Sequence, residues 1–351
     1  FKMRKKYSVL FVAAWMLMSS LFAQIKYSET KKVNQTDDYF GTKVSDPYRW
    51  LEDDKSNETA QWVAAENKVT QDYLSKIPYR DQVKKRLEEM WNYPKYSSPK
   101  KEGKYYYYYK NDGLQNQSIL YRQKGLDGIA EVFVDPNKMS KDGTAAIGRP
   151  SFSKQKKYAA YTIAQAGSDW QEINLLDVAT KKQLTDKVQW VKFSGIAWKG
   201  DEGFFYSRYP QSDEKDKMTN QNEHHKLFYH KLGTQQSADA LIFEDNEHPL
   251  RNVGGGLTED ERFLLVYKSE GTSGNEILVK DMKTPAADFT LLIKGFDTEA
   301  GVIDNDGDRL LVHTNADAPN YKVVSIDPKK PSKENWVTII PTRSKFLQSV
   351  G

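Results

Sequence analysis

The sequence has 351 residues, of which 38% are hydrophobic and 13% aromatic, so it can bury a core large enough for one large domain or two. Its 52 Lys and Arg residues nearly balance 48 Asp and Glu residues, and the two signs are interspersed, which argues against a basic nucleic-acid-binding face. The chain contains no cysteine, which excludes a disulfide framework, a thiolate metal site and a cysteine nucleophile.

Residues 1–23 have the pattern of a secretory signal peptide. A basic start, KMRKK at 2–6, precedes an apolar run at 9–22 that is too short, and too soon followed by polar residues, to favour a spanning helix. We expect cleavage after Ala23, a periplasmic or secreted location and no stable membrane association. The alternative is an amphipathic helix kept in the mature protein. The chain starts at Phe1, upstream of Met3, and stops at Gly351 without a terminal element, which favours a fragment of a longer reading frame.

Residues 24–95 are expected to form a helical segment. Apolar residues recur at helical spacing between Trp62 and Leu74, and the pattern resumes between Val83 and Trp91 after a break at Pro78. Residues 56–59 offer a polar helix start, with an acidic side chain in the first turn near the positive end of the helix dipole. The pattern predicts two helices.

From residue 96 onward, short β-type runs are separated by turns rich in Asp, Asn, Gly and Lys. This spacing is typical of a sandwich, a barrel or a propeller. The predicted strands are 105–110, 119–122, 132–134, 158–163, 173–176, 204–208, 226–230, 263–267, 277–280 and 310–313.

Internal repetition favours a propeller. Residues 151–161 and 257–267 both read as an apolar position, a polar turn and an apolar strand, and 197–206 and 302–312 repeat the plan. The repeats recur at intervals of roughly 45 to 60 residues, the size of a propeller blade. Residues 96–351 therefore hold about five blades, and we expect a mainly β chain whose propeller is preceded by the helical segment.

Several other motifs are given a structural interpretation. The acidic run at 304–308 resembles a calcium loop, but its glycine comes too early and position twelve is Asn315, so a hairpin turn is favoured. His224 and His225 are adjacent and therefore point to different sides, which is poor geometry for a metal. The glycine triplet at 254–256 lacks the helix and lysine of a phosphate loop and favours a strand bend or a close backbone approach. We expect no metal site and no cofactor.

The sequence contains no Gly-x-Ser-x-Gly nucleophile elbow. Acyl transfer needs a serine whose proton is taken by a histidine, with an acid to orient that histidine. All five histidines fall in predicted blades or loops. We therefore expect no catalytic residue in this chain, and no hydrolysis by the chain alone.

Four motifs carry a family resemblance that covers nearly the whole chain after residue 27. They are DPYRWLED at 46–53, GSDW at 167–170, VKFSGIAW at 191–198 and GFFYSRYP at 203–210. Together they resemble the N-terminal half of a prolyl oligopeptidase, whereas the first motif alone is shared with oligopeptidase B enzymes. The resemblance implies a seven-bladed propeller, incomplete here, that caps an α/β-hydrolase domain carrying Ser, Asp and His. It also implies that the helical segment packs on that domain.

The resemblance assigns four residues of the propeller to the substrate region. Phe193, Asn252 and Thr272 fall on the cavity wall, although the last two differ from the family's usual Met and Cys. Asp169 falls where an acidic residue pairs with an arginine of the other domain, and Ser269 stands where an interface arginine is usual. Without the resemblance, Phe193 is equally well interpreted as a core residue and Asp169 as a turn residue.

The activity implied is that of a serine endopeptidase that cleaves short peptides after proline. Its partners would be short proline-containing peptides and the hydrolase domain of the same polypeptide, with no nucleic acid, in a monomer. One alternative is a stand-alone propeller that binds a peptide or protein without catalysis, and another is an oligopeptidase B-type peptidase.

Overall fold

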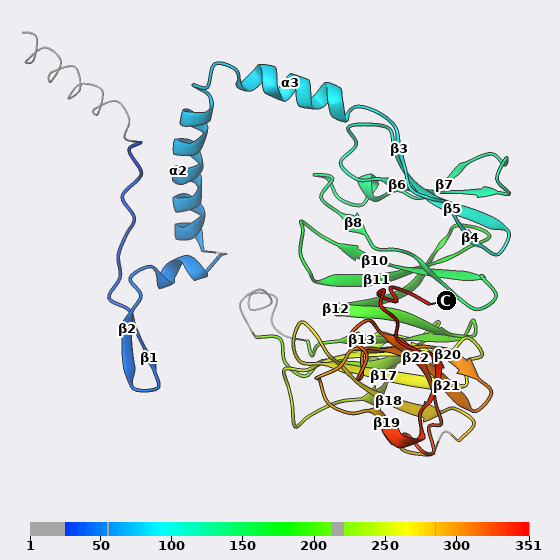
Figure 1. Ribbon diagram of the computed structural model, residues 1–351. Coiled ribbons are helices and arrows are strands. Elements are labelled where there is room, and N and C mark those ends of the chain that lie inside the picture. The colour runs from blue at the N-terminus through cyan, green and yellow to red at the C-terminus, as the bar shows by residue number, and fades with distance from the viewer. Residues whose placement is uncertain (1–24, 55, 212–220, 285, 351) are drawn as a thin grey trace, which may run out of the picture. The chain divides into compact units, whose positions relative to one another are not determined.

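The computed structural model describes residues 25–350, apart from 55, 212–220 and 285 (Figure 1). The expected signal peptide lies outside the described residues. The chain divides into two compact units, one ending at Asn92 and the other beginning at Tyr93. No helix within the described residues combines the length and the apolar content needed to cross a membrane.

The first unit contains the two predicted helices. Its elements are β1 (Thr36–Tyr39), β2 (Thr42–Ser45), the 3-10 helix η1 (Arg49–Glu52), α2 (Asn57–Leu74) and α3 (Arg80–Trp91). The predicted polar start is confirmed, because the Thr59 backbone N–H donates to Ser56 Oγ at 3.1 Å and so caps α2. The β1–β2 hairpin and the short η1 were not predicted; the residues of the two strands are largely exposed.

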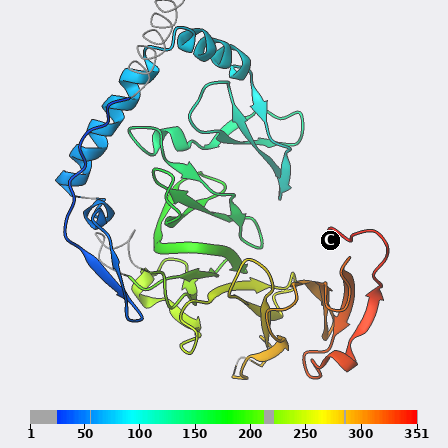
Figure 2. The same ribbon diagram turned by 60° about the vertical axis from the view of Figure 1, so that its left-hand side comes forward.

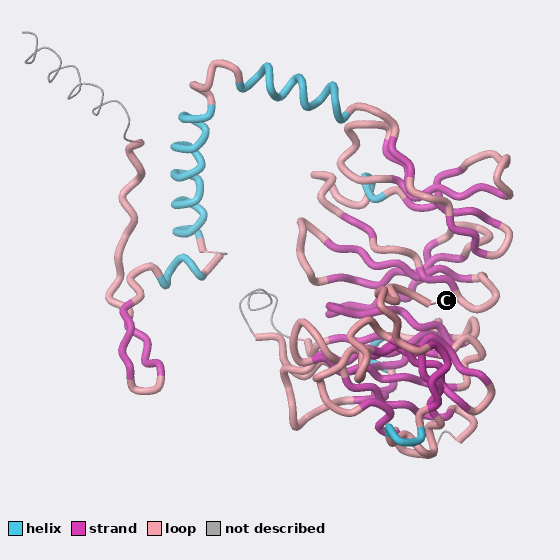
Figure 3. The backbone as a smooth tube through the Cα atoms, in the orientation of Figure 1, coloured by secondary structure: helices cyan, strands magenta, loops and turns pink. Residues whose placement is uncertain are grey.

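The second unit consists of antiparallel blades, and Figure 2 shows them following one another in chain order, from cyan to red. Figure 3 shows that strands dominate this unit. Blade 1 comprises β3 (Lys95–Tyr96), β4 (Lys100–Glu102), β5 (Tyr105–Asn111), β6 (Ile119–Lys124) and β7 (Glu131–Val134). Blade 2 comprises β8 (Ala146–Ile147), β9 (Ser151–Phe152), β10 (Tyr158–Ala164), β11 (Gln171–Asp177) and the first part of β12 (Gln183–Lys199).

Blade 3 comprises the rest of β12, β13 (Gly203–Arg208), β14 (Lys226–Lys231) and β15 (Ala240–Phe243). Blade 4 comprises β16 (Asn252–Leu257), β17 (Phe263–Ser269), β18 (Glu276–Asp281) and β19 (Thr290–Ile293). Blade 5 comprises β20 (Ala300–Asp306), β21 (Arg309–Thr314), β22 (Lys322–Ile326) and β23 (Val337–Ile340). Every strand predicted from the sequence lies within an observed strand, and the propeller fold is confirmed.

The long strand β12 joins blades 2 and 3 into one eight-stranded sheet. Its first part pairs with β11, from Leu176 with Gln183 to Gln171 with Val191. Its last part pairs with β13, ending at Lys199 with Gly203. Between the two parts the register shifts, and Trp190 and Phe193 take positive φ values of 62° and 53°. The strand therefore kinks where it passes from one blade to the next.

Each pair of neighbouring blades shares its own hydrophobic core. Tyr107 and Tyr161 belong to the core between blades 1 and 2, and Val188 and Phe204 to the core between blades 2 and 3. Blades 3 and 4 meet around Leu227, whereas the core between blades 4 and 5 contains the largest group of buried side chains. Alternate positions of each strand face these cores, as the period of a pleated strand requires.

The repeats found in the sequence are the hairpins of the first two long strands in each blade, and they touch one another along one edge of the sheets. We call this the hairpin edge. The Gly200 N–H donates to Glu261 Oε1 at 2.9 Å, from blade 3 to blade 4, and the Glu259 N–H donates to Asp304 Oδ1 at 2.9 Å, from blade 4 to blade 5. The run at 304–308 lies in such a hairpin, turning at Gly307 with φ of 58°, as predicted.

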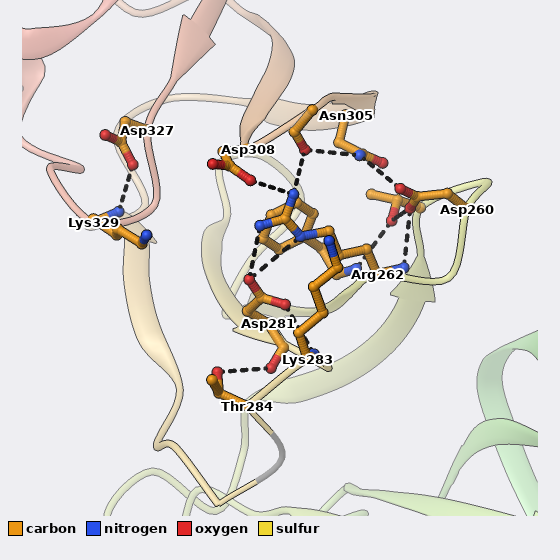
Figure 4. A network of polar contacts seen from close by, with 12 residues as sticks. Asp260, Arg262, Asp281, Lys283, Thr284, Asn305, Asp308, Asp327 and Lys329 are labelled. Atoms are coloured by element: carbon orange, nitrogen blue, oxygen red, sulfur yellow. Dashed lines mark hydrogen bonds and ion pairs between the residues drawn. The ribbon is translucent and has the colours of Figure 1, made fainter.

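Arg262 is the centre of the polar network that joins blades 4 and 5 at the hairpin edge (Figure 4). Its guanidinium lies 3.1 Å from Asp281 Oδ2 and also pairs with Asp308, while Asn305 Nδ2 donates to Asp260 Oδ2 at 3.0 Å. The hydrogen bond and positive charge of Arg262 lower the pKa of Asp308. These side-chain contacts hold the hairpins of blades 4 and 5 together, where no described strand of one blade pairs with a strand of the other.

The glycine triplet lies in β16, where it allows a close approach as predicted. A Cβ atom added at Gly255 would stand 2.5 Å from Leu227 Cδ1 of the neighbouring blade. Leu227 is fully buried, so a side chain at position 255 would force it to shift.

A candidate binding site on the loop edge

The four residues assigned from the sequence lie on the edge opposite the hairpins, which we call the loop edge. Asp169 stands in the loop between β10 and β11, and Phe193 occupies the kink of β12. Asn252 is the first residue of β16, and Thr272 follows β17. Antiparallel pairing brings strand ends and the following strand beginnings to one edge, so residues far apart in the sequence share this surface.

Phe193 is exposed over 61% of its surface, so it is not the core residue that its type alone allowed. Its φ of 53° lies in the left-handed region, which typically costs a residue with a side chain about 1–3 kcal/mol. At Phe193 the pairing of β12 passes from β11 to β13 with a shift in register. The paired residues on either side hold the strained backbone in place. An exposed aromatic ring on a strained, well-supported backbone is typical of a binding surface.

Lys192 connects Phe193 to the loop that carries Asp169. Its ammonium lies 5.1 Å from the centre of the Phe193 ring and 5.3 Å from that of Trp170, and its side chain is only 12% exposed. Asp169 Oδ2 lies 3.7 Å from the same ammonium, while the Asp169 side chain is 71% exposed. A long and exposed ion pair of this kind contributes little stability, so Asp169 keeps room for a second cation.

Tyr209 connects the same cluster to Asn252 in the next blade. The Tyr209 hydroxyl donates to Asn252 Oδ1 at 2.7 Å, and its ring meets Trp170 edge to face with centres 5.9 Å apart. The other side of the Tyr209 ring stacks on His225 at 4.4 Å. Asp169, Phe193 and Asn252 thus belong to one group of contacting residues.

His225 supports this group from within the core. It is 2% exposed, and its Nδ1 accepts the Val253 N–H at 3.0 Å. Burial lowers the pKa of His225 to about 4, so the ring is neutral at pH 7 and supplies packing and one acceptor. Its neighbour His224 has a positive φ of 59° and is partly exposed. No cluster of three metal-ligating side chains occurs in the part of the chain that the structure describes.

Thr272 belongs to a second group that adjoins the first. Asn252 pairs directly with Ser269 across β16 and β17, and Ser269 and Thr272 both line a cavity of about 570 Å³ between blades 4 and 5. Glu299 and Tyr321 line the same cavity, and the Tyr321 hydroxyl donates to the Glu299 carboxylate. The loop edge therefore offers an aromatic group at blades 2 to 4 and a polar cavity at blades 4 and 5.

The cations beside Ser269 are already paired within the propeller. Lys268 lies 3.2 Å from Asp245 and 2.7 Å from Glu276, and Arg251 lies 2.8 Å from Glu270. Burial alone would raise the pKa of Glu276, but the hydrogen bond and charge of Lys268 outweigh it and lower the pKa. The residues next to Ser269 thus form their own ion-pair network.

The chemistry of the loop edge is that of binding. Among the described residues, no histidine ring hydrogen-bonds to a Ser or Thr hydroxyl, which is the contact that activates a serine nucleophile. The exposed ring of Phe193 and the side chains around it suit an apolar ligand with a few polar groups.

Sequence reasoning did not single out Lys192, Tyr209 or His225 for this site. A signal was present for two of them, because Lys192 and Tyr209 lie inside the motifs at 191–198 and 203–210. Their contacts with Trp170 and Asn252 join different blades and so depend on the fold.

Comparison with known proteins gives one consistent result. The family described as "Prolyl oligopeptidase, N-terminal beta-propeller domain" matches residues 27–351. The chain is 49% identical over 324 residues to a prolyl endopeptidase of Elizabethkingia miricola, a match covering 92% of this chain and 46% of the relative. A prolyl endopeptidase of Elizabethkingia meningoseptica is 50% identical over the same shares. The chain therefore spans about half the length of these relatives.

Solved structures agree with the sequence comparison. A variant of prolyl oligopeptidase B from Galerina marginata, bound to a 35mer hydrolysis and macrocyclization substrate, is 30% identical with a TM-score of 0.79. That match covers 92% of this chain and 48% of the solved one. A structure from an analysis of two prolyl endopeptidases is 30% identical with a TM-score of 0.80, covering 91% of this chain and 47% of that chain.

Proposed function

Because this chain belongs to the prolyl oligopeptidase family, we propose that it forms the substrate-facing half of a serine endopeptidase that cleaves short peptides after proline. The observation that carries the proposal is the exposed Phe193, held with a left-handed backbone on the same edge as Asn252 and Thr272. The names of the relatives at about half identity support the reaction class.

In this proposal the chemistry and the selection of substrate are divided between two parts of one polypeptide. A hydrolase domain supplies the nucleophile, its base and the contacts that recognise proline. The propeller supplies an aromatic wall and admits short peptides while excluding folded proteins. Asp169 is available to pair with an arginine of the hydrolase domain, since its side chain is 71% exposed and its contact with Lys192 is long.

The helical segment has a role in the same proposal. Within the structure α3 has no buried residue, although Val83 and Leu87 follow each other at helical spacing. An amphipathic helix gains most of its stability from packing its apolar face, so we assign this face to the hydrolase domain. A signal peptide at 1–23 would direct the enzyme, as a monomer, to the periplasm or outside the cell.

The test is hydrolysis of a fluorogenic proline-amide reporter by two purified proteins. One is this chain alone, and the other continues through the reading frame that follows Gly351. We expect turnover only by the longer protein, and none after its elbow serine is replaced by Ala. Turnover by the chain alone would disprove the division of labour. Turnover by neither, with each protein folded, would favour a non-catalytic propeller that binds peptide or protein.

A further inference from the structure

The interface between blades 3 and 4 has the fewest fully buried residues of the four junctions described, and more of its packing comes from partly buried side chains. Five buried residues form its core, compared with ten between blades 4 and 5 and eight at each of the other two junctions described. Beside this core lies a cavity of about 250 Å³. Its apolar lining includes Phe205, Leu241, Ile242, Met282 and Phe289. The gap is therefore a place where the two blades leave apolar surface uncovered.

Two lysines stand at this cavity without a carboxylate partner. Lys199 Nζ lies 5.9 Å from the Tyr229 ring centre, and Lys280 Nζ lies 5.6 Å from that of Phe289. Both rings line the cavity. No ion pair of either ammonium is found among the described residues, and no Asp or Glu lines the cavity. Each cation thus lies near an aromatic ring without a direct carboxylate partner, while the charges of Glu202 and Glu261 act on Tyr229 from farther away.

A second apolar hollow on the propeller has a different charge pattern. The cavity near β19 and η4 (Lys333–Asn335) includes Asp297 in its lining, and its Lys333 pairs with Asp317. The lining of this hollow also includes Lys294. The lining between blades 3 and 4 differs in holding two lysines and no carboxylate.

We propose that the cavity between blades 3 and 4 binds a small carboxylic acid that carries an aromatic or branched alkyl group. The apolar group fills the space next to Ile242 and Met282, and the carboxylate lies between the ammonium groups of Lys199 and Lys280. Apolar burial supplies affinity, and the two cations select an anion over its neutral analogue. This site lies away from the loop edge and does not depend on the proposed peptidase function.

The test uses the purified chain with 4-phenylbutyrate, and with the neutral 4-phenylbutyramide as matched ligand. We expect ligand-observed NMR titration to give a dissociation constant of about 0.1–1 mM for the acid and at least about fivefold weaker binding for the amide. Lys280→Gln should weaken binding of the acid about fivefold and leave binding of the amide unchanged. Lys294→Gln, in the other hollow, is the control and should change neither.

A second variant, Leu241→Trp, tests whether the ligand occupies the cavity itself. Leu241 is 47% exposed, so the larger ring can fill the space from its rim without entering the core, and it should abolish binding of the acid. Urea unfolding of each variant shows whether it is folded. Equal affinities for acid and amide, or no effect of Lys280→Gln, would overturn the proposal. It is overturned equally if a peptide ending in Phe with a free carboxylate binds while 4-phenylbutyrate does not, because the ligand is then a peptide terminus.

Discussion

His230 is completely buried between two carboxylates where blades 2 and 3 meet. Its Nδ1 lies 2.7 Å from Asp239 Oδ1 and its Nε2 lies 3.2 Å from Asp186 Oδ1, so both ring nitrogens face acceptors. Tyr206 also donates to Asp239, at 2.6 Å. Burial by itself would lower the pKa of His230, but the hydrogen bonds and charges of Asp239 and Asp186 outweigh it and raise the pKa. An imidazolium that donates from both nitrogens satisfies both contacts.

Replacing His230 with Leu removes both donors and leaves the two carboxylates buried with less compensation. Removing one partner of a buried ion pair costs about 3–5 kcal/mol, and we expect a loss of that size in the free energy of unfolding near pH 7. The raised pKa sets the sign of the pH dependence. The stabilisation by His230 is complete below its unfolded pKa of about 6.5 and is lost as the pH rises through its folded pKa.

The measurement is urea unfolding of wild type and His230→Leu at about pH 6.5 and at about pH 9. The difference in unfolding free energy should be largest at the lower pH and shrink at the higher one. His248→Gln is the matched control, because His248 pairs with Asp245 but its side chain is 45% exposed, and it should cost less than about 1 kcal/mol. A loss below about 1 kcal/mol in His230→Leu, or a difference independent of pH, would refute the assignment of a buried imidazolium.

Three further predictions concern other parts of the chain. In the protein extended beyond Gly351, Phe193→Ala should lower kcat/KM for a peptide reporter about tenfold, mainly by raising KM. The free energy of unfolding should not change, because the ring is 61% exposed. Unaltered kinetics would show that Phe193 is not part of the substrate site. Gly255→Ala should lower the free energy of unfolding in urea by about 1–3 kcal/mol, because its Cβ would lie 2.5 Å from Leu227 Cδ1. Gly256→Ala is the control, because its Cβ meets only ordinary contacts from 3.5 Å outward. Equal losses in the two variants would contradict this explanation. Ser56→Ala should destabilise the start of α2 by about 1 kcal/mol, seen as faster amide exchange in its first turn, and unchanged exchange would show that the cap is dispensable.

The strands that sequence patterns revealed are those whose apolar residues are consecutive. In β17 the first four residues are buried, and in β11 four consecutive residues are buried, so both stand out as hydrophobic runs. The first strands of blades 4 and 5 do not stand out as hydrophobic runs. In β16 half of the residues are glycine, and β20 ends in an acidic run, because these strands are only partly buried. A search for apolar runs therefore finds the middle of a blade more readily than its first strand.

The candidate site was predictable only through the family resemblance. Aromatic residues mostly fill cores, so nothing local in the sequence indicates that Phe193 is exposed. Its exposure follows from the kink of β12, and that kink depends on pairing with two strands that belong to different blades. The contact between Tyr209 and Asn252 likewise joins residues 43 positions apart. Such features are set by long-range pairing, which single-sequence patterns do not contain.

The continuity of β12 has a mechanical consequence. If neighbouring blades contacted each other only through side chains, the propeller could open at any junction between blades. Blades 2 and 3 share seventeen consecutive residues of backbone, so a gap between them requires breaking main-chain hydrogen bonds as well as parting side chains. We expect breathing motions to concentrate at the other junctions, so that these two blades move as one rigid body. Phe193, at the middle of the shared strand, would then be carried along with that body and keep its orientation while the rest of the ring flexes.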